Sequence, residues 1–269
     1  MLLLVTCAVS LLGQSQRRDA SESRMSSQRT RAESGDVKAQ VELGIAYASG
    51  DGIEKDESEA VKWFRRAAAL DDPAGEYSLG EMYLTGRGVE LNRQEGAKWI
   101  RLAAEAGDPR AQFNLAAMYA EGTGVTKNDH DAAAWMRKAA EQGFAAGQFG
   151  LGSMYAHGKG VPENAEEAAR WYRKAAEQGD LAAINNLAFL LATSPNAKVR
   201  DPREAVVIAR KGVEANEDNP TLWDTLAAAY YESGQPAKAV DAERQALVLR
   251  QGDRFYEKSL EKYTVAAKH

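Results

Sequence analysis

The chain has 269 residues, of which 44% are hydrophobic and 27% are charged, and its formal net charge is −5. That is enough apolar material for a continuous core, whereas a mildly acidic chain is a poor candidate for binding nucleic acid, which needs clustered positive charge. Charged residues are abundant, and the chain contains only seven prolines. This composition favours helix over strand. The single cysteine excludes an intramolecular disulfide framework and a thiolate metal cluster.

The N-terminal part of the sequence contains a strongly apolar run, Leu2 to Leu12, which is too short to span a bilayer as a helix. It is typical of a secretory signal peptide over residues 1–15, although the basic residues that usually precede such a run are missing. A mis-assigned start or a frayed apolar terminus is the alternative. We expect an exported protein, periplasmic or secreted, if residues 1–15 are a signal peptide, and a cytoplasmic protein otherwise. Residues 16–34 are polar and predict a flexible linker.

From residue 35 onward, four units repeat with a step of 36 residues and no insertion. The aligned series are Trp63, Trp99, Trp135 and Trp171, then Tyr47, Tyr83, Tyr119 and Tyr155, and the glycines Gly50, Gly86, Gly122 and Gly158 with Gly52, Gly88, Gly124 and Gly160. A fixed period of this length predicts stacked units, each of which buries its apolar face against the next. We interpret the tryptophans as packing residues of these units, with ligand stacking as the alternative.

Each unit predicts two helices joined by a glycine-containing turn. In the first helix, Leu43 and Tyr47 are four residues apart and share one face, and Gly50 ends the helix because glycine tolerates the left-handed conformation. The second helix opens at a capping residue followed by an acid at the third helical position. These capping residues are Asp56, Asn92, Asn128 and Asn164.

The segments LGIAYASGDGI, LGEMYLTGRGV, LAAMYAEGTGV and LGSMYAHGKGV, three of them followed by A-x-x-W, resemble the Sel-one-like repeat. The resemblance covers residues 35–179, with Ala116 where the family has glycine. Residues 180–253 resemble two tetratricopeptide-type repeats, and the single apolar stripe of residues 254–269 is typical of a capping helix. The resemblance implies an all-α fold, a right-handed α-solenoid of helix-turn-helix repeats that forms a superhelix.

No set of reactive side chains stands out in the sequence. The histidines His130, His157 and His269 have no His or Cys partner at zinc-ligand spacing. The segment 129–131, Asp-His-Asp, could suggest a metal site, but it lies where a second helix should begin. At the start of a helix, the helix dipole stabilises acidic side chains.

Two further motifs resemble catalytic signatures only in part. Residues 152–159 have one residue too many between their glycines for a phosphate loop. Ser259 and Lys262 match the first element of the penicillin-recognising serine enzymes, but no Ser-Asp-Asn or Lys-Thr-Gly element follows. We therefore predict no catalytic residue, no metal and no cofactor. A cell-envelope enzyme of the penicillin-binding or penicillin-hydrolysing type is the alternative function.

The resemblance implies a bacterial, non-enzymatic scaffold or adaptor that binds other proteins or peptides on a concave face lined by the first helices. We expect a monomer that binds no nucleic acid and has no stable membrane span; a regulatory lid on a membrane-bound complex is a third interpretation. The predicted groove residues are Lys38, Val41, Ile45, Tyr77, Glu81, Arg110, Phe113, Phe149, Ser153, His157, Asn185, Asp224 and Tyr231.

The groove positions include one row that is aromatic in three units and one slot whose residue type changes from unit to unit. Tyr77, Phe113 and Phe149 keep the 36-residue step, and this aromatic row serves either packing or partner contact. One slot instead varies from unit to unit, and we expect it to determine specificity. Its occupants are Ile45, Glu81, Ala117 and Ser153.

Overall fold

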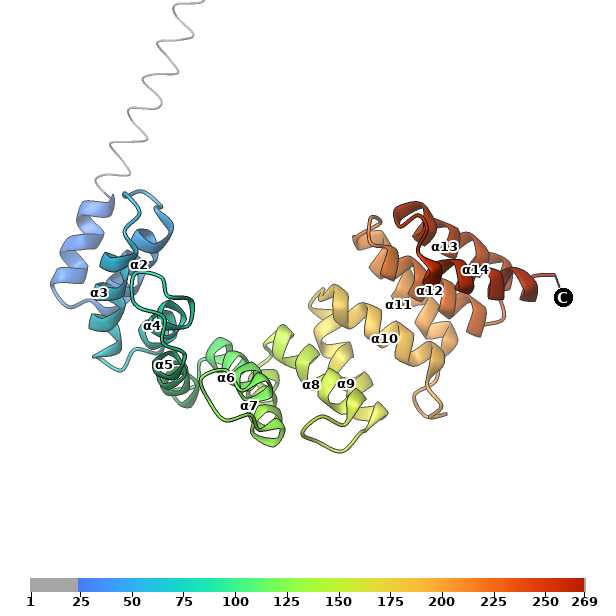
Figure 1. Cartoon of the computed structure of the whole chain (residues 1–269), viewed down its shortest axis with the longest axis horizontal. Helices are drawn as coiled ribbons and strands as arrows, with labels where there is room; N and C mark the ends of the chain where they lie inside the picture. Colours follow the sequence, from blue (N-terminus) through green and yellow to red (C-terminus); the bar gives the residue numbers. More distant parts are fainter. Residues whose placement is uncertain (1–23, 269) are drawn as a thin grey trace, which may run out of the picture. The chain divides into compact units, whose positions relative to one another are not determined.

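The computed structural model describes residues 24–268, and every regular element in that part of the chain is a helix (Figure 1). The predicted all-α class is therefore confirmed. The predicted signal peptide, residues 1–15, and residues 16–23 of the predicted linker lie outside the described residues. The labelled helices are α2 (Val37–Ser49), α3 (Glu57–Ala68), α4 (Pro73–Thr85), α5 (Arg93–Glu105), α6 (Pro109–Glu121), α7 (Asp129–Glu141), α8 (Ala145–His157), α9 (Ala165–Glu177), α10 (Leu181–Thr193), α11 (Pro202–Ala215), α12 (Pro220–Glu232), α13 (Pro236–Leu249) and α14 (Arg254–Ala266).

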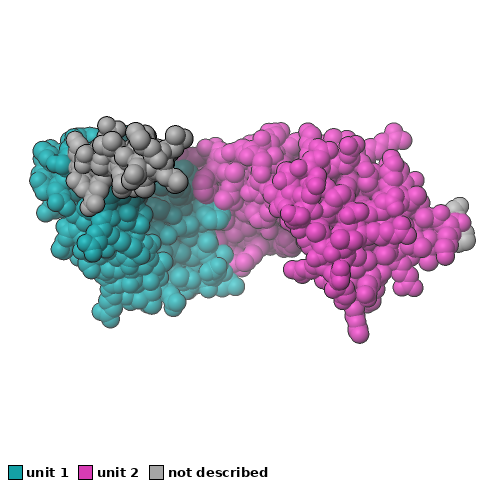
Figure 2. Space-filling model, turned by 90° about the horizontal axis from the view of Figure 1, so that it is seen from above, with its two compact units in different colours: residues 1–127 teal, residues 128–269 magenta. Residues whose placement is uncertain are grey.

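The chain divides into two compact units, residues 1–127 and residues 128–269 (Figure 2). Within unit 1, each helix from α3 to α6 packs on the helix before it, and within unit 2 the same holds from α8 to α14. Helix α10 also packs on α12, so first helices of neighbouring repeats meet directly there. Successive hairpins stacked in this way form the predicted α-solenoid. The division falls inside the third 36-residue unit, between α6 and α7.

The helices begin and end at the residues that the capping pattern predicts. The Asp56 side chain accepts a hydrogen bond from the Glu59 backbone N–H at the start of α3, and Asn92, Asn128 and Asn164 cap α5, α7 and α9 in the same way. Gly50 ends α2 in the left-handed conformation, with φ at 81°. A repeated local signal thus sets the length of each hairpin.

The tryptophans are packing residues, as the sequence predicts. Trp63 and Trp171 are 5% and 4% exposed, and Trp99 packs against the buried cluster of unit 1. Trp135 is half-buried, with the Lys138 ammonium 3.7 Å from its ring centroid. Trp63 belongs to the same buried cluster as Ala60, a small residue that is fully buried.

The prediction of a flexible linker through residue 34 is wrong for residues 24–33, which form a helix. Met25 and Ala32 are 7% and 1% exposed, and the Gln40 side-chain amide donates to the Ala32 carbonyl over 3.1 Å. The Arg29 guanidinium donates to the Tyr47 hydroxyl. The same pairing, 18 residues apart, recurs between hairpins as Arg65–Tyr83, Arg101–Tyr119 and Arg137–Tyr155. Residues 24–33 therefore take the place of a second helix before α2, and burial against α2 orders a segment whose composition is mostly polar.

Candidate functional site

In unit 1, most of the predicted groove side chains are accessible. Those of Lys38, Ile45 and Arg110 are exposed, and those of Tyr77, Glu81 and Phe113 are half-buried. Val41 is only 8% exposed and belongs to the buried core, so its assignment to a groove is wrong. We name the accessible set, together with Asn114 of α6, the unit 1 surface.

Asn114, which the sequence-based prediction missed, joins two first helices within this surface. Its amide nitrogen donates to the Tyr77 hydroxyl over 3.1 Å and to the Glu81 carboxylate over 3.0 Å. Both amide N–H bonds of one side chain on α6 are thus used to hold two side chains of α4. A sequence signal was present, because Asn186 occupies the same register two repeats later.

The Glu81 carboxylate is half-buried and takes part in no ion pair within residues 24–268. Burial raises its pKa, and the hydrogen bond from Asn114 opposes that rise. Burial also raises the pKa of Tyr77, with a smaller contribution from the charge of Glu81. The nearby cation, Arg110, is engaged elsewhere: its guanidinium lies 4.7 Å from the Tyr77 ring centroid and 2.6 Å from the Asp108 carboxylate. Glu81 is therefore a partly desolvated carboxyl without a counterion among residues 24–268.

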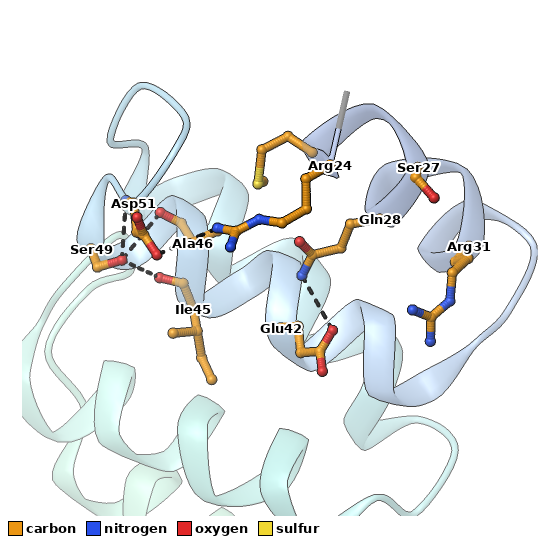
Figure 3. Close-up of a pocket in the computed structure, with 10 residues that line it drawn as sticks. Arg24, Ser27, Gln28, Arg31, Glu42, Ile45, Ala46, Ser49 and Asp51 are labelled. Atoms are coloured by element: carbon orange, nitrogen blue, oxygen red, sulfur yellow. Dashed lines mark hydrogen bonds and ion pairs between the residues drawn. The ribbon is translucent and has the colours of Figure 1, made fainter. Parts of the chain in front are cut away.

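A cavity of about 590 Å³ lies beside the unit 1 surface, between residues 24–33 and α2 (Figure 3). The exposed side chain of Ile45 lies on its wall. The polar groups around it largely satisfy one another: Arg24 is 3.8 Å from the Asp51 carboxylate, and the Gln28 amide donates to Glu42 over 3.5 Å.

In unit 2, the predicted groove residues of α8 and α10 are also accessible. We name the following set the unit 2 surface: Phe149, Ser153 and His157 of α8, with Asn185 and Phe189 of α10. Phe189 is 50% exposed. The Tyr172 hydroxyl of α9 forms hydrogen bonds with Ser153 and Asn186, and its ring centroid lies 5.8 Å from that of Phe149.

Two polar groups of the unit 2 surface differ in how they are satisfied. The His157 Nδ1 lies 2.8 Å from the Ser153 carbonyl oxygen, one helical turn away, so this ring is engaged with its own helix. The Asn185 Oδ1 is buried and has no hydrogen-bond partner among the described residues. A side-chain oxygen in that state can accept a hydrogen bond from a molecule that binds there.

Asp224 and Tyr231 of α12 take part in contacts among the C-terminal helices. Asp224 interacts with Glu243 of α13, and burial raises the pKa of Asp224 to about 6. The Tyr231 ring centroid lies 5.0 Å from that of Tyr263 on α14 and 4.3 Å from the Lys262 ammonium. The structure thus places these two predicted groove residues where α12 meets α13 and α14.

Within residues 24–268, no group of three or more His, Cys, Asp or Glu side chains is placed to hold a metal ion. The Asn128 side chain accepts from the backbone N–H groups of His130 and Asp131, so the Asp-His-Asp segment forms the start of α7. Ser259 and Lys262 lie on α14, and His269 lies outside the described residues. In the same described range, no helix combines the length and the apolar character that crossing a membrane requires.

The 36-residue units match a known family model. Four consecutive matches to the Sel1 repeat cover residues 37–72, 73–108, 109–144 and 145–180, and each contains one pair of helices from α2 to α9. No curated protein sequence matches the chain. Beyond the last match, α10 to α13 continue as helix-turn-helix pairs.

Solved structures give the same assignment. A protective antigen with an SLR fold, present in uropathogenic Escherichia coli strains, is 33% identical, with a TM-score of 0.72 and coverage of 91% of this chain and 56% of that chain. A Sel1 repeat protein from Oxalobacter formigenes is 29% identical, with a TM-score of 0.63 and coverage of 79% and 85%. The Cut9–Hcn1 hetero-tetramer of APC/C, at 12% identity, a TM-score of 0.57 and coverage of 93% and 46%, shares the helical fold alone. This chain thus spans about half the length of the antigen. With four family matches that together span residues 37–180, it belongs to the Sel1 repeat family.

Proposed function

We propose that this protein is a non-enzymatic scaffold that binds segments of partner proteins on the exposed faces of its first helices. Repeats of this family typically mediate protein–protein interactions. The repeat frame supports this role because packing residues recur at every step, while accessible positions between them carry different chemistry. The variable slot holds Ile45, Glu81, Ala117 and Ser153.

The observation that carries the proposal is the state of Glu81. Its carboxylate is half-buried, is fixed by Asn114 over 3.0 Å, and has no cation beside it in the described chain. A partly desolvated anion gains free energy when a cation approaches, and a partner in contact with α4 and α6 can supply one. We propose that the partner segment places a lysine or arginine side chain at Glu81. The aromatic groups of Tyr77 and Phe113 provide contact area for the rest of that segment.

The unit 2 surface supports a contact of different character. It combines the exposed ring of Phe189 with the amide and hydroxyl groups of Asn185 and Ser153 and carries no acidic side chain. Such groups suit the backbone and apolar side chains of a bound segment. We therefore propose that charge selection takes place on the unit 1 surface.

Selection of peptides from a random phage-displayed library tests the proposal with a defined probe. The wild-type protein should enrich peptides that share a basic residue at one position. The variant Glu81→Lys should enrich an acidic residue there instead, and Glu90→Gln, a charge change in the loop after α4, should leave the basic preference intact. If no variant enriches any sequence, the scaffold proposal is contradicted. If enriched peptides show no charge preference, or keep the basic one with Glu81→Lys, the role of Glu81 is contradicted.

The alternative enzyme of penicillin-binding or penicillin-hydrolysing type has a separate test. Ser259 and Lys262 both lie on α14, and the Lys262 ammonium contacts the Tyr231 ring. Turnover of nitrocefin by the purified protein, lost on Ser259→Ala, would establish that function. We expect no turnover.

We also propose that the protein is bacterial, monomeric and exported. The apolar run between Leu2 and Leu12 and the lack of cysteine after Cys7 support the export part of this proposal. Sequencing the N-terminus of the protein recovered from its native cells tests it: a start after residue 15 agrees with export, and retention of residues 1–15 contradicts cleavage.

A further inference from the structure

Helix α13 contains a carboxylate that is fully enclosed by the protein. Glu243 is 0% exposed, and neither of its carboxylate oxygens has a hydrogen-bond donor within residues 24–268. A buried ionised carboxylate without a donor or a cation is strongly unfavourable, so such a group requires a physical explanation.

The group that faces Glu243 is a second carboxyl, that of Asp224 on α12. Two ionised carboxylates can only repel each other, whereas a pair that shares one proton forms a hydrogen bond. Burial raises the pKa of Glu243 to about 8, and the charge of Asp224 adds to that rise. Burial also raises the pKa of Asp224, to about 6. The pair is therefore stable in the interior only while it retains a proton.

One side chain of α14, Tyr263, lies close enough to this pair to interact with both charges. Tyr263 is 5% exposed, and its ring centroid lies 5.0 Å from that of Tyr231 on α12. Burial raises the pKa of Tyr263 most, and the charges of Asp224, Glu243 and Glu232 raise it further. Of these, Glu232 is already paired with Arg200 over 2.6 Å. On α14, the ammonium of Lys262 lies over the rings of Tyr231 and Tyr263, at 4.3 and 5.7 Å from their centroids.

Helix α14 is also weakly held. It buries only two residues, Tyr256 and Tyr263, whereas α13 buries five. Of its other large apolar side chains, Leu260 is partly buried against the same cluster, whereas Phe255 and Val265 are 62% and 55% exposed. Because the free energy of local opening follows the buried contacts of a segment, α14 can leave α13 at lower cost than the α12–α13 hairpin can open.

From this arrangement we infer that α14 is a pH-dependent latch: it stays docked while Asp224 and Glu243 share a proton and undocks when both carboxyls are ionised. Undocking removes Tyr263 from beside the pair and lets water reach Glu243, whereas Asp224 is already partly exposed. It also uncovers apolar residues of α12 and α13 that share a buried cluster with Tyr263, including Leu226 and Val240. The C-terminal end of the solenoid would thus present an apolar surface only above neutral pH.

The direction of the pH effect follows from the two acids. A carboxyl whose pKa is raised in the docked state stabilises that state. The stabilisation is complete when pH is below the ordinary pKa of the carboxyl. That stabilisation declines as pH rises, and the decline is complete once pH passes the raised value. For this pair the loss extends from about pH 4 to about pH 8: both acids contribute to it up to about pH 6, and Glu243 alone continues it to about pH 8.

Hydrogen exchange measured on peptides from residues 254–266 of the full chain tests the latch. In Glu243→Gln, the new amide can donate to Asp224 at every pH, so α14 should stay protected. Comparing variants at one pH cancels the intrinsic pH dependence of exchange. At about pH 5 the wild type and Glu243→Gln should exchange alike, and at about pH 9 the wild type should exchange about tenfold faster, which corresponds to one pKa unit. The matched control Asp241→Asn removes an exposed carboxylate of the same helix and should follow the wild type.

Two outcomes would overturn the inference. One is an equal exchange rate of residues 254–266 in the wild type and Glu243→Gln at both pH values. The other is a faster rate in the wild type that extends equally through α12 and α13, because that result indicates opening of the whole hairpin. If Glu243→Gln does not fold, Asp224→Asn serves the same purpose, since its amide can donate to Glu243.

Discussion

One position in the repeat shows how a single residue alters the stability of a hairpin. Gln40, Gln112 and Gln148 are each 5% exposed, and each side-chain amide donates to a carbonyl eight residues earlier, over 3.1, 3.1 and 3.3 Å. In the remaining repeat the equivalent residue is Glu76, which is 4% exposed and has one carboxylate oxygen without a partner. An ionised glutamate has no hydrogen to donate to the equivalent carbonyl.

We predict that Glu76→Gln stabilises the protein by about 1–2 kcal/mol at neutral pH. A net hydrogen bond contributes about 1 kcal/mol, and an unsatisfied buried polar group costs about 1–3 kcal/mol. Burial raises the pKa of Glu76 most, and the charges of Asp71, Asp72 and Glu105 raise it further. The ionised form of Glu76 is therefore disfavoured in the fold. The substitution preserves shape and supplies the missing donor.

The gain should depend on pH with a definite sign. A protonated Glu76 can donate as glutamine does, so the two proteins should be nearly equal in stability at about pH 4, near the ordinary pKa of glutamate. As pH rises, the wild type loses the stability that this group contributes, because its pKa is raised in the fold, whereas the variant loses nothing at this site. Urea denaturation followed by far-UV circular dichroism at several pH values measures the difference.

The reverse substitution provides a matched control. Gln112→Glu places a carboxylate against the Ala104 carbonyl and should destabilise the protein by a similar amount at neutral pH. If Glu76→Gln is neutral or destabilising at neutral pH, or if its gain is the same at low pH, the role assigned to the buried carboxylate is refuted.

Two further predictions concern the backbone. Asp71 has a φ of 55°, at a position where the other repeats place glycine, so Asp71→Gly should stabilise the protein by about 0.5–1 kcal/mol in thermal denaturation; a lower Tm would contradict this. Gly88 and Gly107 both have positive φ, but a Cβ at Gly88 would lie 2.1 Å from the Glu57 carbonyl oxygen, whereas one at Gly107 meets nothing within 4 Å. Gly88→Ala should therefore destabilise by about 1–3 kcal/mol more than Gly107→Ala, and equal losses of stability would show that the close approach is unimportant.

The positions of the helices could be predicted because the signals that define them are local. A cap such as Asn92 and a left-handed glycine such as Gly50 act within one turn of chain, and the 36-residue period repeats them four times. The family assignment rests on the same repeated residues. Periodicity also indicated correctly that the tryptophans pack, since residues repeated in every unit serve the contacts between units.

The candidate surfaces were predictable only in part. The periodicity of the first helices predicted accessible positions for Tyr77, Glu81 and Phe149, and these side chains are accessible. It predicted the same for Val41, which is buried. It missed Asn114, because the function of that amide depends on two side chains of another helix. It also assigned Asp224 to an open groove, although this carboxyl faces a neighbouring helix.

The sequence by itself determined the helices, their caps, the repeat length and the family of this protein, because each depends on residues close together in the chain. Only the tertiary structure decided that residues 24–33 form a helix on α2, that Asn114 holds Glu81, and that Glu76 and Glu243 are acids enclosed by the fold. Burial and charge pairing arise between helices that are distant in sequence, and a side chain acquires its solvent exposure and its neighbours only when those helices pack.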